Sequence, residues 1–324
     1  MKKYLTTMIL LLAAISGLLF GNKQASQASD ITRRDRESSS GSMKSDSQSE
    51  ASSESNYSSS HLAEASNDES SQEDQTGLTF DSIEELVGYT IDQYQLDPNA
   101  LSIAWTDLRT GEEFHHNSQV AQHAASTNKV GTAALYANLI NQGILSWESE
   151  IAYDPSYWED GGGEITAGPP EASYSIYELV YQSLYYSDNT AWNMLINNYY
   201  QQFGDFQSDL IALSGIEVTD PELYNINYAN ADMLNQILIY LASDSGFEPI
   251  TDIMRQAQEG IFLKMYVDNM AAKYGQYEDS YHDTGIYYQG DQPIYTIAVM
   301  SHDQGSIDYF LGDLNLYLSQ WVQK

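Results

Sequence analysis

The stretch Ala124-Ala125-Ser126-Thr127-Asn128-Lys129-Val130 places a hydroxyl and an amine three residues apart at the start of an apolar run. The run stops at Gly143, which predicts a helix with a glycine just past its end. Residues i and i+3 share a helix face, so Ser126 and Lys129 should lie side by side. A serine becomes a good nucleophile when a neutral lysine can take its proton. Ser126 is therefore a candidate acylation site, although such a pair is more often an ordinary helix start.

The composition excludes several classes of function. The chain has 324 residues and no cysteine, so it forms no disulfide and has no thiolate for metal or catalysis. Its six histidines show no helical zinc-binding spacing, and we expect no metal and no cofactor. The formal net charge is −33, which argues against nucleic acid as a partner.

The N-terminal region has the pattern of an exported protein. Lys2 and Lys3 precede an uncharged, largely apolar run that ends at Asn22, so residues 1–28 are predicted to be a signal peptide or an N-terminal membrane anchor. Residues 29–76 are rich in Ser, Asp, Glu and Gln and are predicted to be a disordered linker. We therefore expect an extracytoplasmic domain, either secreted or anchored, with contact to the membrane only through its N-terminal segment and with possible access to the cell wall.

Residues 77–324 are predicted to form one folded domain. Strand patterns occur near its start, at 101–108, and near its end, at 270–273, 281–288 and 294–301. Helical patterns lie between them and at the C-terminus, at 177–185, 190–199, 207–214, 231–242, 249–263 and 306–322. This order predicts an α+β fold, in which both ends of the domain form an antiparallel sheet that is flanked by helices and carries an inserted all-helical lobe.

Two further motifs combine polar groups that catalysis can use. Ser187-Asp188-Asn189 lies between two helical stretches, and Lys273-Tyr274-Gly275 ends a predicted strand. Taken singly, the first is a typical capping turn and the second a surface lysine before a turn glycine. Residues 77–324 hold six basic and 35 acidic residues, a net charge of −29, and only four lysines. Two of those four lysines belong to the motifs, which favours a functional role for them.

In this order, the three motifs resemble the set found in class A β-lactamases and penicillin-binding proteins: Ser-x-x-Lys, Ser-Asp-Asn and Lys-Thr-Gly. The resemblance covers about residues 79–324. It implies that Ser126 attacks a lactam or peptide carbonyl, that Lys129 takes its proton, and that Ser187 relays a proton toward the leaving nitrogen.

The resemblance also implies how a substrate is held. Asn189 would bind the side-chain amide of the substrate, and Lys273, followed by Tyr274 and Gly275, would attract its carboxylate. The backbone N–H groups of Ser126 and Gln276 would form the oxyanion hole. The expected partners are accordingly β-lactams or D-alanyl peptides.

The sequence departs from the family pattern at two places. Tyr274 replaces the threonine of Lys-Thr-Gly, and its longer phenol cannot take the same position. The Glu-x-x-Leu-Asn pattern of class A enzymes, whose glutamate activates water for deacylation, has its nearest match in Asp220-Pro221-Glu222-Leu223-Tyr224. Asp220 or Glu222 is thus the candidate base, and a turn with a solvated face is the alternative. Without a base in position, deacylation would be weak.

Three functions remain open on this basis. The protein could be a serine β-lactamase, a penicillin-binding-protein-like D-Ala-D-Ala peptidase of cell-wall metabolism, or a catalytically impaired, tethered binding domain. An α/β-hydrolase is not supported, because the chain contains no Gly-x-Ser-x-Gly elbow.

Overall fold

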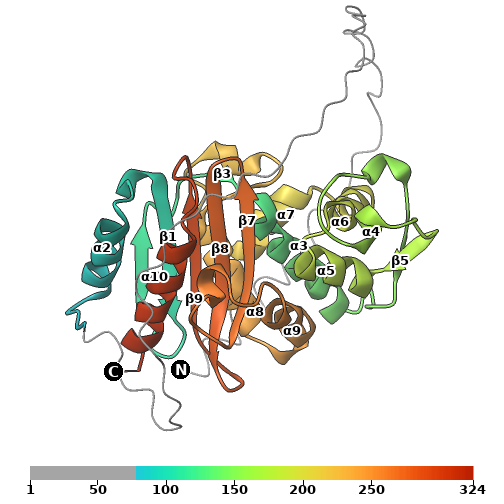
Figure 1. Ribbon diagram of the computed structural model, residues 1–324. Coiled ribbons are helices and arrows are strands. Elements are labelled where there is room, and N and C mark those ends of the chain that lie inside the picture. Colours follow the sequence, from blue (N-terminus) through green and yellow to red (C-terminus); the bar gives the residue numbers. More distant parts are fainter. Residues whose placement is uncertain (1–77, 324) are drawn as a thin grey trace, which may run out of the picture. The chain divides into compact units, whose positions relative to one another are not determined.

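The computed structural model describes residues 78–323, which belong to one compact unit (Figure 1). The predicted signal peptide or anchor and the predicted linker lie outside the described residues, so both stay predictions. Among the described residues, no helix combines the length and the apolar character that crossing a membrane requires.

A five-stranded sheet, in the order β2-β1-β9-β8-β7, forms the centre of the domain, and each neighbouring pair is antiparallel. Its strands are β1 (Leu101–Asp107), β2 (Glu113–His116), β7 (Met270–Tyr277), β8 (Ser280–Gln289) and β9 (Gln292–Ser301). The N-terminal strand β1 pairs with the C-terminal strand β9, with Ile103 opposite Val299. The predicted joining of both ends of the domain in one antiparallel sheet is therefore confirmed.

Two helices cover one face of this sheet (Figure 1), namely α2 (Ile83–Tyr94) and α10 (Asp308–Trp321). Helix α2 begins after Ser82, because the Ser82 side chain accepts a hydrogen bond from the Glu85 N–H and caps the helix. Buried apolar side chains of both helices pack with Trp105 and Tyr295 of the sheet into one cluster. Burial of this cluster holds the two ends of the domain together.

The other face of the sheet carries α8 (Ala231–Ala242), which contacts β1, β8 and β9, while α9 (Glu248–Gln256) packs on β7. Beyond them lies the helical lobe, with α3 (Asn128–Asn141), α4 (Glu164–Ala167), α5 (Ile176–Tyr185), α6 (Asn189–Gln202) and α7 (Phe206–Ser214). A second buried cluster joins this lobe to α8 and the sheet. The inserted helical lobe predicted from the sequence is thus present.

Short elements connect these layers. Strand β3 (Gln122–His123) pairs with β6 (Tyr228–Ala229), and β4 (Glu150–Ala152) pairs with β5 (Ser173–Ser175). The β3–β6 pair brings the chain just before Ser126 beside the segment that follows the predicted deacylation loop. These pairs were not predicted, because strands of two or three residues leave no periodic signal.

Two predicted boundaries were wrong. The helix predicted at 249–263 ends at Gln256, because Gln258 and Gly260 adopt left-handed backbone conformations with φ of 45° and 74°. The buried Lys264 ammonium then caps the helix by donating to the carbonyls of Arg255 and Ala257. Strand β7 runs on to Tyr277, so Lys273 lies inside the strand and not at its end.

Candidate active site

Ser126 lies in a 3₁₀ turn, η2 (Ala125–Thr127), that leads directly into α3. The sequence predicted Ser126 within the helix itself, whereas α3 begins two residues later, at Asn128. Ala125 has a φ of 49°, a left-handed conformation that costs a non-glycine residue roughly 1 kcal/mol or more. Such strain is kept only where the surroundings enforce it.

Strand β7 passes so close to this turn that Gly275 leaves no room for a side chain. A Cβ built on Gly275 would lie 2.8 Å from the backbone nitrogen of Ser126 and 2.9 Å from that of Thr127. This contact explains the glycine of the third motif by close approach and not by turn formation. It also places the edge of β7 beside the candidate nucleophile.

The side chain of Ser187 connects all three motifs. Its Oγ lies 2.8 Å from the Oγ of Ser126, 3.2 Å from Nζ of Lys129 and 3.1 Å from Nζ of Lys273. Ser187 itself has a φ of 61°, a second strained residue at this place. The three motifs predicted to meet therefore do meet.

Lys129 is almost fully buried and has three hydrogen-bond partners. Its Nζ lies 2.7 Å from the backbone carbonyl oxygen of Ser187 and 2.7 Å from Oδ1 of Asn189, in addition to the Ser187 hydroxyl. It makes no hydrogen bond to Ser126 within residues 78–323. The link between the predicted base and the predicted nucleophile therefore passes through Ser187.

Burial and a like charge both favour the neutral form of Lys129. Its pKa is lowered well below the usual value, first by desolvation and then by the charge of Lys273, against smaller opposing effects of Asp188 and Glu159. Lys273 is fully buried too, and its burial lowers its pKa to about 7. A neutral amine is the protonation state that a general base requires.

Asp188 holds the second motif in place and does not face Ser126. Its carboxylate accepts hydrogen bonds from the N–H groups of Ile165, Thr166 and Ala191 and from the Thr166 hydroxyl. It thus caps α6 and also binds the start of α4. These contacts give the residue a structural role in the site.

The consecutive glycines 161–163 form the other side of this arrangement, a role the sequence analysis missed. A Cβ on Gly162 would lie 2.2 Å from the Tyr186 carbonyl oxygen, and one on Gly163 would lie 2.2 Å from Asp188 Oδ2. The preceding Asp160 carbonyl accepts a 2.7 Å hydrogen bond from Asn189 Nδ2. The signal for this close packing was the run of three glycines itself.

Tyr274 does not place its phenol where the threonine hydroxyl was expected. Its ring stacks on Phe262, with 5.1 Å between centroids, and packs with the apolar cluster on the α2–α10 side of the sheet. Its backbone N–H donates to Oε1 of Gln258 at 2.7 Å, so this N–H faces the open edge of β7. In an antiparallel strand, the N–H two residues along, at Gln276, points to the same edge.

Asp283 is a buried acid beside Lys273 that the sequence analysis did not identify. Its carboxylate accepts hydrogen bonds from Gln258 Nε2 and from the N–H groups of Leu263 and Thr284. Burial raises the pKa of Asp283 to about 7, against the lowering effect of these hydrogen bonds. No local pattern distinguished it from the other acidic residues of the domain.

The two candidate deacylation bases are engaged elsewhere. Asp220 Oδ1 accepts from the N–H of Glu222, and its Oδ2 lies 3.4 Å from the Ala121 N–H. The exposed Glu222 binds the side-chain amide of Asn225. Within the described residues, neither carboxylate hydrogen-bonds to Ser126, Lys129 or Ser187, so the structure gives no contact through which either would act on an acyl group there.

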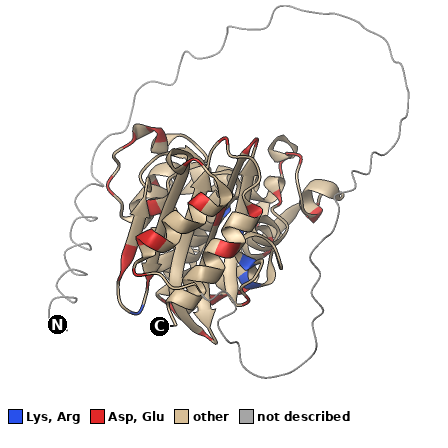
Figure 2. Cartoon of the chain, turned by 60° about the vertical axis from the view of Figure 1, so that its left-hand side comes forward, with Lys and Arg blue, Asp and Glu red and all other residues tan. Residues whose placement is uncertain are grey.

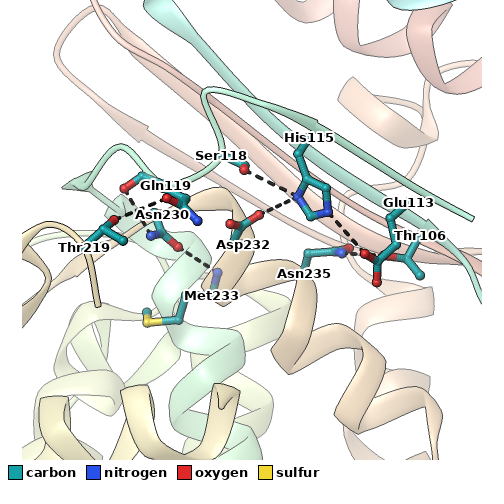
Figure 3. Close-up of polar contacts among 10 residues, drawn as sticks. All are labelled: Thr106, Glu113, His115, Ser118, Gln119, Thr219, Asn230, Asp232, Met233 and Asn235. Atoms are coloured by element: carbon teal, nitrogen blue, oxygen red, sulfur yellow. Dashed lines mark hydrogen bonds and ion pairs between the residues drawn. The ribbon is translucent and has the colours of Figure 1, made fainter. Parts of the chain in front are cut away.

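Asp220 instead lines a separate, open pocket of about 620 Å³ together with His115, Ser118, Gln119 and Asp232. In this region (Figure 3), His115 Nδ1 lies 2.8 Å from Asp232 Oδ1, and the Thr219 hydroxyl contacts Gln119. The pocket lining contains none of the residues of the three motifs.

No group of three or more His, Asp or Glu side chains among the described residues is arranged to hold a metal ion.

Acidic residues are spread over the domain, whereas basic residues are few (Figure 2). Residues 78–323 contain five basic side chains, and Lys129, Lys264 and Lys273 among them are buried. Lys264 caps α9, which leaves Lys129 and Lys273 as the two lysines of the site. Any substrate approaches them through a strongly negative field.

A half-buried serine that is joined to a buried lysine by a second serine, beside a strand edge, is a site suited to acyl transfer. The model of the beta-lactamase enzyme family matches residues 81–313. The chain therefore belongs to the beta-lactamase enzyme family, a family of serine hydrolases.

Solved structures of similar fold agree with this assignment. The chain is similar to PBP-A (18% identity, TM-score 0.63, covering 74% of this chain and 96% of that one). It is also similar to a β-lactamase from Sphaerobacter thermophilus (19% identity, TM-score 0.62, 73% and 97% covered) and to an ancestral class A β-lactamase (18% identity, TM-score 0.63, 74% and 100% covered). At these identities the likeness shows the fold. No curated protein matches the sequence significantly.

Proposed function

We propose that the protein is an extracytoplasmic serine acyl-transfer enzyme that forms an acyl-enzyme on Ser126 with β-lactams or with related amides such as D-alanyl peptides. The observation that carries this proposal is the series of contacts from the half-buried Ser126 through Ser187 to the buried Lys129. A related structure, that of a point mutant of PBP-A, is described as an acyl-enzyme complex with penicillin G, which supports penicillin as a probe for this chain.

The hydrogen bonds of Lys129 suggest a route for the proton. A neutral amine has two N–H groups and one lone pair. The Ser187 carbonyl and Asn189 Oδ1, both at 2.7 Å, take the two N–H groups, which leaves the lone pair for the Ser187 hydroxyl. Hydroxyl protons rotate, so Ser126 can donate to Ser187 while Ser187 donates to Lys129.

Acylation then follows in balanced steps. As Ser126 Oγ bonds to the substrate carbonyl carbon, its proton passes to Ser187 and the Ser187 proton passes to Lys129. When the carbon–nitrogen bond breaks, the same path returns a proton to the leaving nitrogen. The N–H groups of Ser126 and Gln276 are the proposed donors that stabilise the oxyanion.

The proposal includes slow deacylation. Asp220 and Glu222 are the candidate bases, and both are bound to other groups. With neither carboxylate beside Ser126, water attacks the ester without an efficient base, and the acyl-enzyme accumulates. This favours a penicillin-binding-protein-like peptidase over an efficient β-lactamase, and a binding domain without acylation is the remaining alternative.

One experiment separates these functions. The full chain is mixed with a fluorescent penicillin and, separately, with a chromogenic cephalosporin, and Ser126→Ala serves as the control. We expect one covalent adduct per chain, absent in the control, and little sustained colour release. Sustained colour release that depends on Ser126 would establish a β-lactamase, and the absence of any adduct would overturn the proposed acylation.

The proposed extracytoplasmic setting rests on residues 1–28 and has its own test. In intact cells that express the chain, an externally added protease should remove the domain. Resistance of the domain until the cells are lysed would contradict this setting.

A further inference from the structure

The residue that shapes the strained turn before Ser126 is His123. It is the last residue of β3, and its Nδ1 accepts a hydrogen bond from the Ala125 N–H at 3.3 Å. Ala125 is the residue with the left-handed φ of 49°. The imidazole therefore accepts a hydrogen bond from the residue that adopts the unfavourable backbone conformation.

The contacts of the ring define its protonation state. Because Nδ1 accepts, the proton of the neutral ring lies on Nε2. Nδ2 of Asn227 lies 3.2 Å from Nε2, and Oδ1 of the same amide is buried with no hydrogen-bond partner among the described residues. Because the amide oxygen and nitrogen are assigned from the hydrogen-bond network, the exchanged orientation lets Nε2–H donate to Oδ1.

A second histidine holds the backbone of the first. His282, which is 1% exposed, lies on β8 directly opposite Gly275. Its Nε2 donates to the His123 carbonyl at 2.9 Å, and its Nδ1 accepts from the Ser301 N–H at 3.1 Å. The turn that carries Ser126 is thereby connected to the centre of the sheet.

The surroundings of His123 keep its ring neutral. Tyr277 of β7 packs against it in a tilted arrangement at 4.1 Å between centroids, and Tyr228 of β6 meets it edge-on at 6.1 Å. Burial lowers its pKa below the usual value, against the smaller, opposing effect of Glu278. The other titratable neighbour, His282, has a pKa lowered to about 4 by burial and stays neutral at physiological pH.

We propose that His123, held by His282, is a positioning residue whose neutral ring fixes the left-handed turn at Ala125 and so presents Ser126 for acylation. The proposal rests on the proposed acylation of Ser126. If Nδ1 carried a proton, the ring N–H would face the Ala125 N–H, the hydrogen bond between them would be lost, and the turn would no longer be held. Acid should therefore slow acylation through His123, separately from any effect on Lys129 or Lys273.

Two variants of the full chain test this role. In His123→Asn, the amide oxygen takes the place of Nδ1, accepts the Ala125 N–H and does not titrate. In His123→Phe, the ring contact with Tyr277 remains and the acceptor is lost. The second-order rate of labelling by fluorescent penicillin is measured for each from about pH 4.5 to 8.

We expect His123→Asn to label within about twofold of the wild-type rate at neutral pH and to slow less than the wild type toward acid pH, because only the effect of the two lysines remains. We expect His123→Phe to label roughly 10- to 100-fold more slowly at every pH, because the nucleophile is misplaced. Wild-type rates for His123→Phe, or an acid decline in His123→Asn that matches the wild type, would overturn the proposal.

A measurement that requires no substrate separates this idea from the proposed function. Nitrogen-15 NMR spectra of the His123 ring in the wild-type protein should show the proton on Nε2 at neutral pH. A proton on Nδ1 would refute the positioning role. If the wild type is labelled neither by penicillin nor by a fluorophosphonate, the proposed acylation fails, while the ring spectrum still tests the hydrogen bond.

Discussion

Ser187 is the residue on which the candidate site depends, because its Oγ is the common partner of Ser126, Lys129 and Lys273. Ser187→Ala removes the hydroxyl that joins Lys129 to the nucleophile. We expect acylation to slow by roughly 10²- to 10⁴-fold, the usual contribution of a positioned proton-transfer group. The measurement is the rate of labelling by fluorescent penicillin.

Ser183→Ala is the matched control for this change. The Ser183 hydroxyl is buried on the neighbouring helix α5 and has no hydrogen-bond partner among the described residues. Its removal should leave labelling unchanged and stability equal or slightly higher. Equal labelling rates in the Ser187 variant and the wild type would exclude the proton path through Ser187.

Gly275 tests the close approach of β7 to the nucleophile turn. In Gly275→Ala, the new Cβ would meet the backbone nitrogens of Ser126 and Thr127 at under 3.0 Å, and neither can move without shifting the turn. We expect a loss of labelling of at least about tenfold, since small displacements of reacting groups are costly. Retained labelling would mean that the turn at Ser126 can shift without loss of reactivity, which would argue against a rigid oxyanion hole.

At the scale of the single element, α2 contains an exposed glycine in its interior. Gly88 has ordinary helical geometry and no atom within 4 Å of a built Cβ. Gly88→Ala should raise the free energy of unfolding by about 0.5–1 kcal/mol, because alanine loses less backbone entropy on folding. Chemical denaturation monitored by circular dichroism measures this change.

Gly290→Ala is the same chemical change in a different backbone conformation. Its site is equally open, but its φ is 60° in the β8–β9 turn. There we expect destabilisation, because a side chain rarely adopts this conformation. A stabilised Gly290 variant, or an unstabilised Gly88 variant, would show that backbone conformation does not decide these effects.

At the scale of the whole molecule, the acidic surface should oppose the arrival of an anionic substrate. Residues 78–323 contain 35 acidic and five basic side chains. The screening length falls from about 30 Å at 0.01 M salt to about 8 Å at 0.15 M. Labelling by an anionic penicillin should therefore accelerate roughly two- to tenfold over this range.

The control for this prediction is an uncharged penicillin ester, whose labelling rate should not change with salt. Acceleration of both probes would point to an effect of salt on the protein itself. A salt-independent rate for the anionic probe would mean that the field of the domain does not reach the site.

The sequence by itself determined the fold class, the pairing of both ends of the domain in one sheet, and the three motifs of the candidate site, because each follows from a local pattern or from the order of motifs along the chain. Helix α8 was predicted to the residue for the same reason. Only the tertiary structure decided that Lys129 meets Ser126 through Ser187, that Tyr274 turns to the far face of the sheet, and that Asp220 and Glu222 bind other partners. It also decided the roles of glycines 161–163, Asp283 and the two histidines at Ser126. All of these features depend on which segments, distant in the sequence, approach each other in the fold. Such contacts leave no periodic pattern in the sequence.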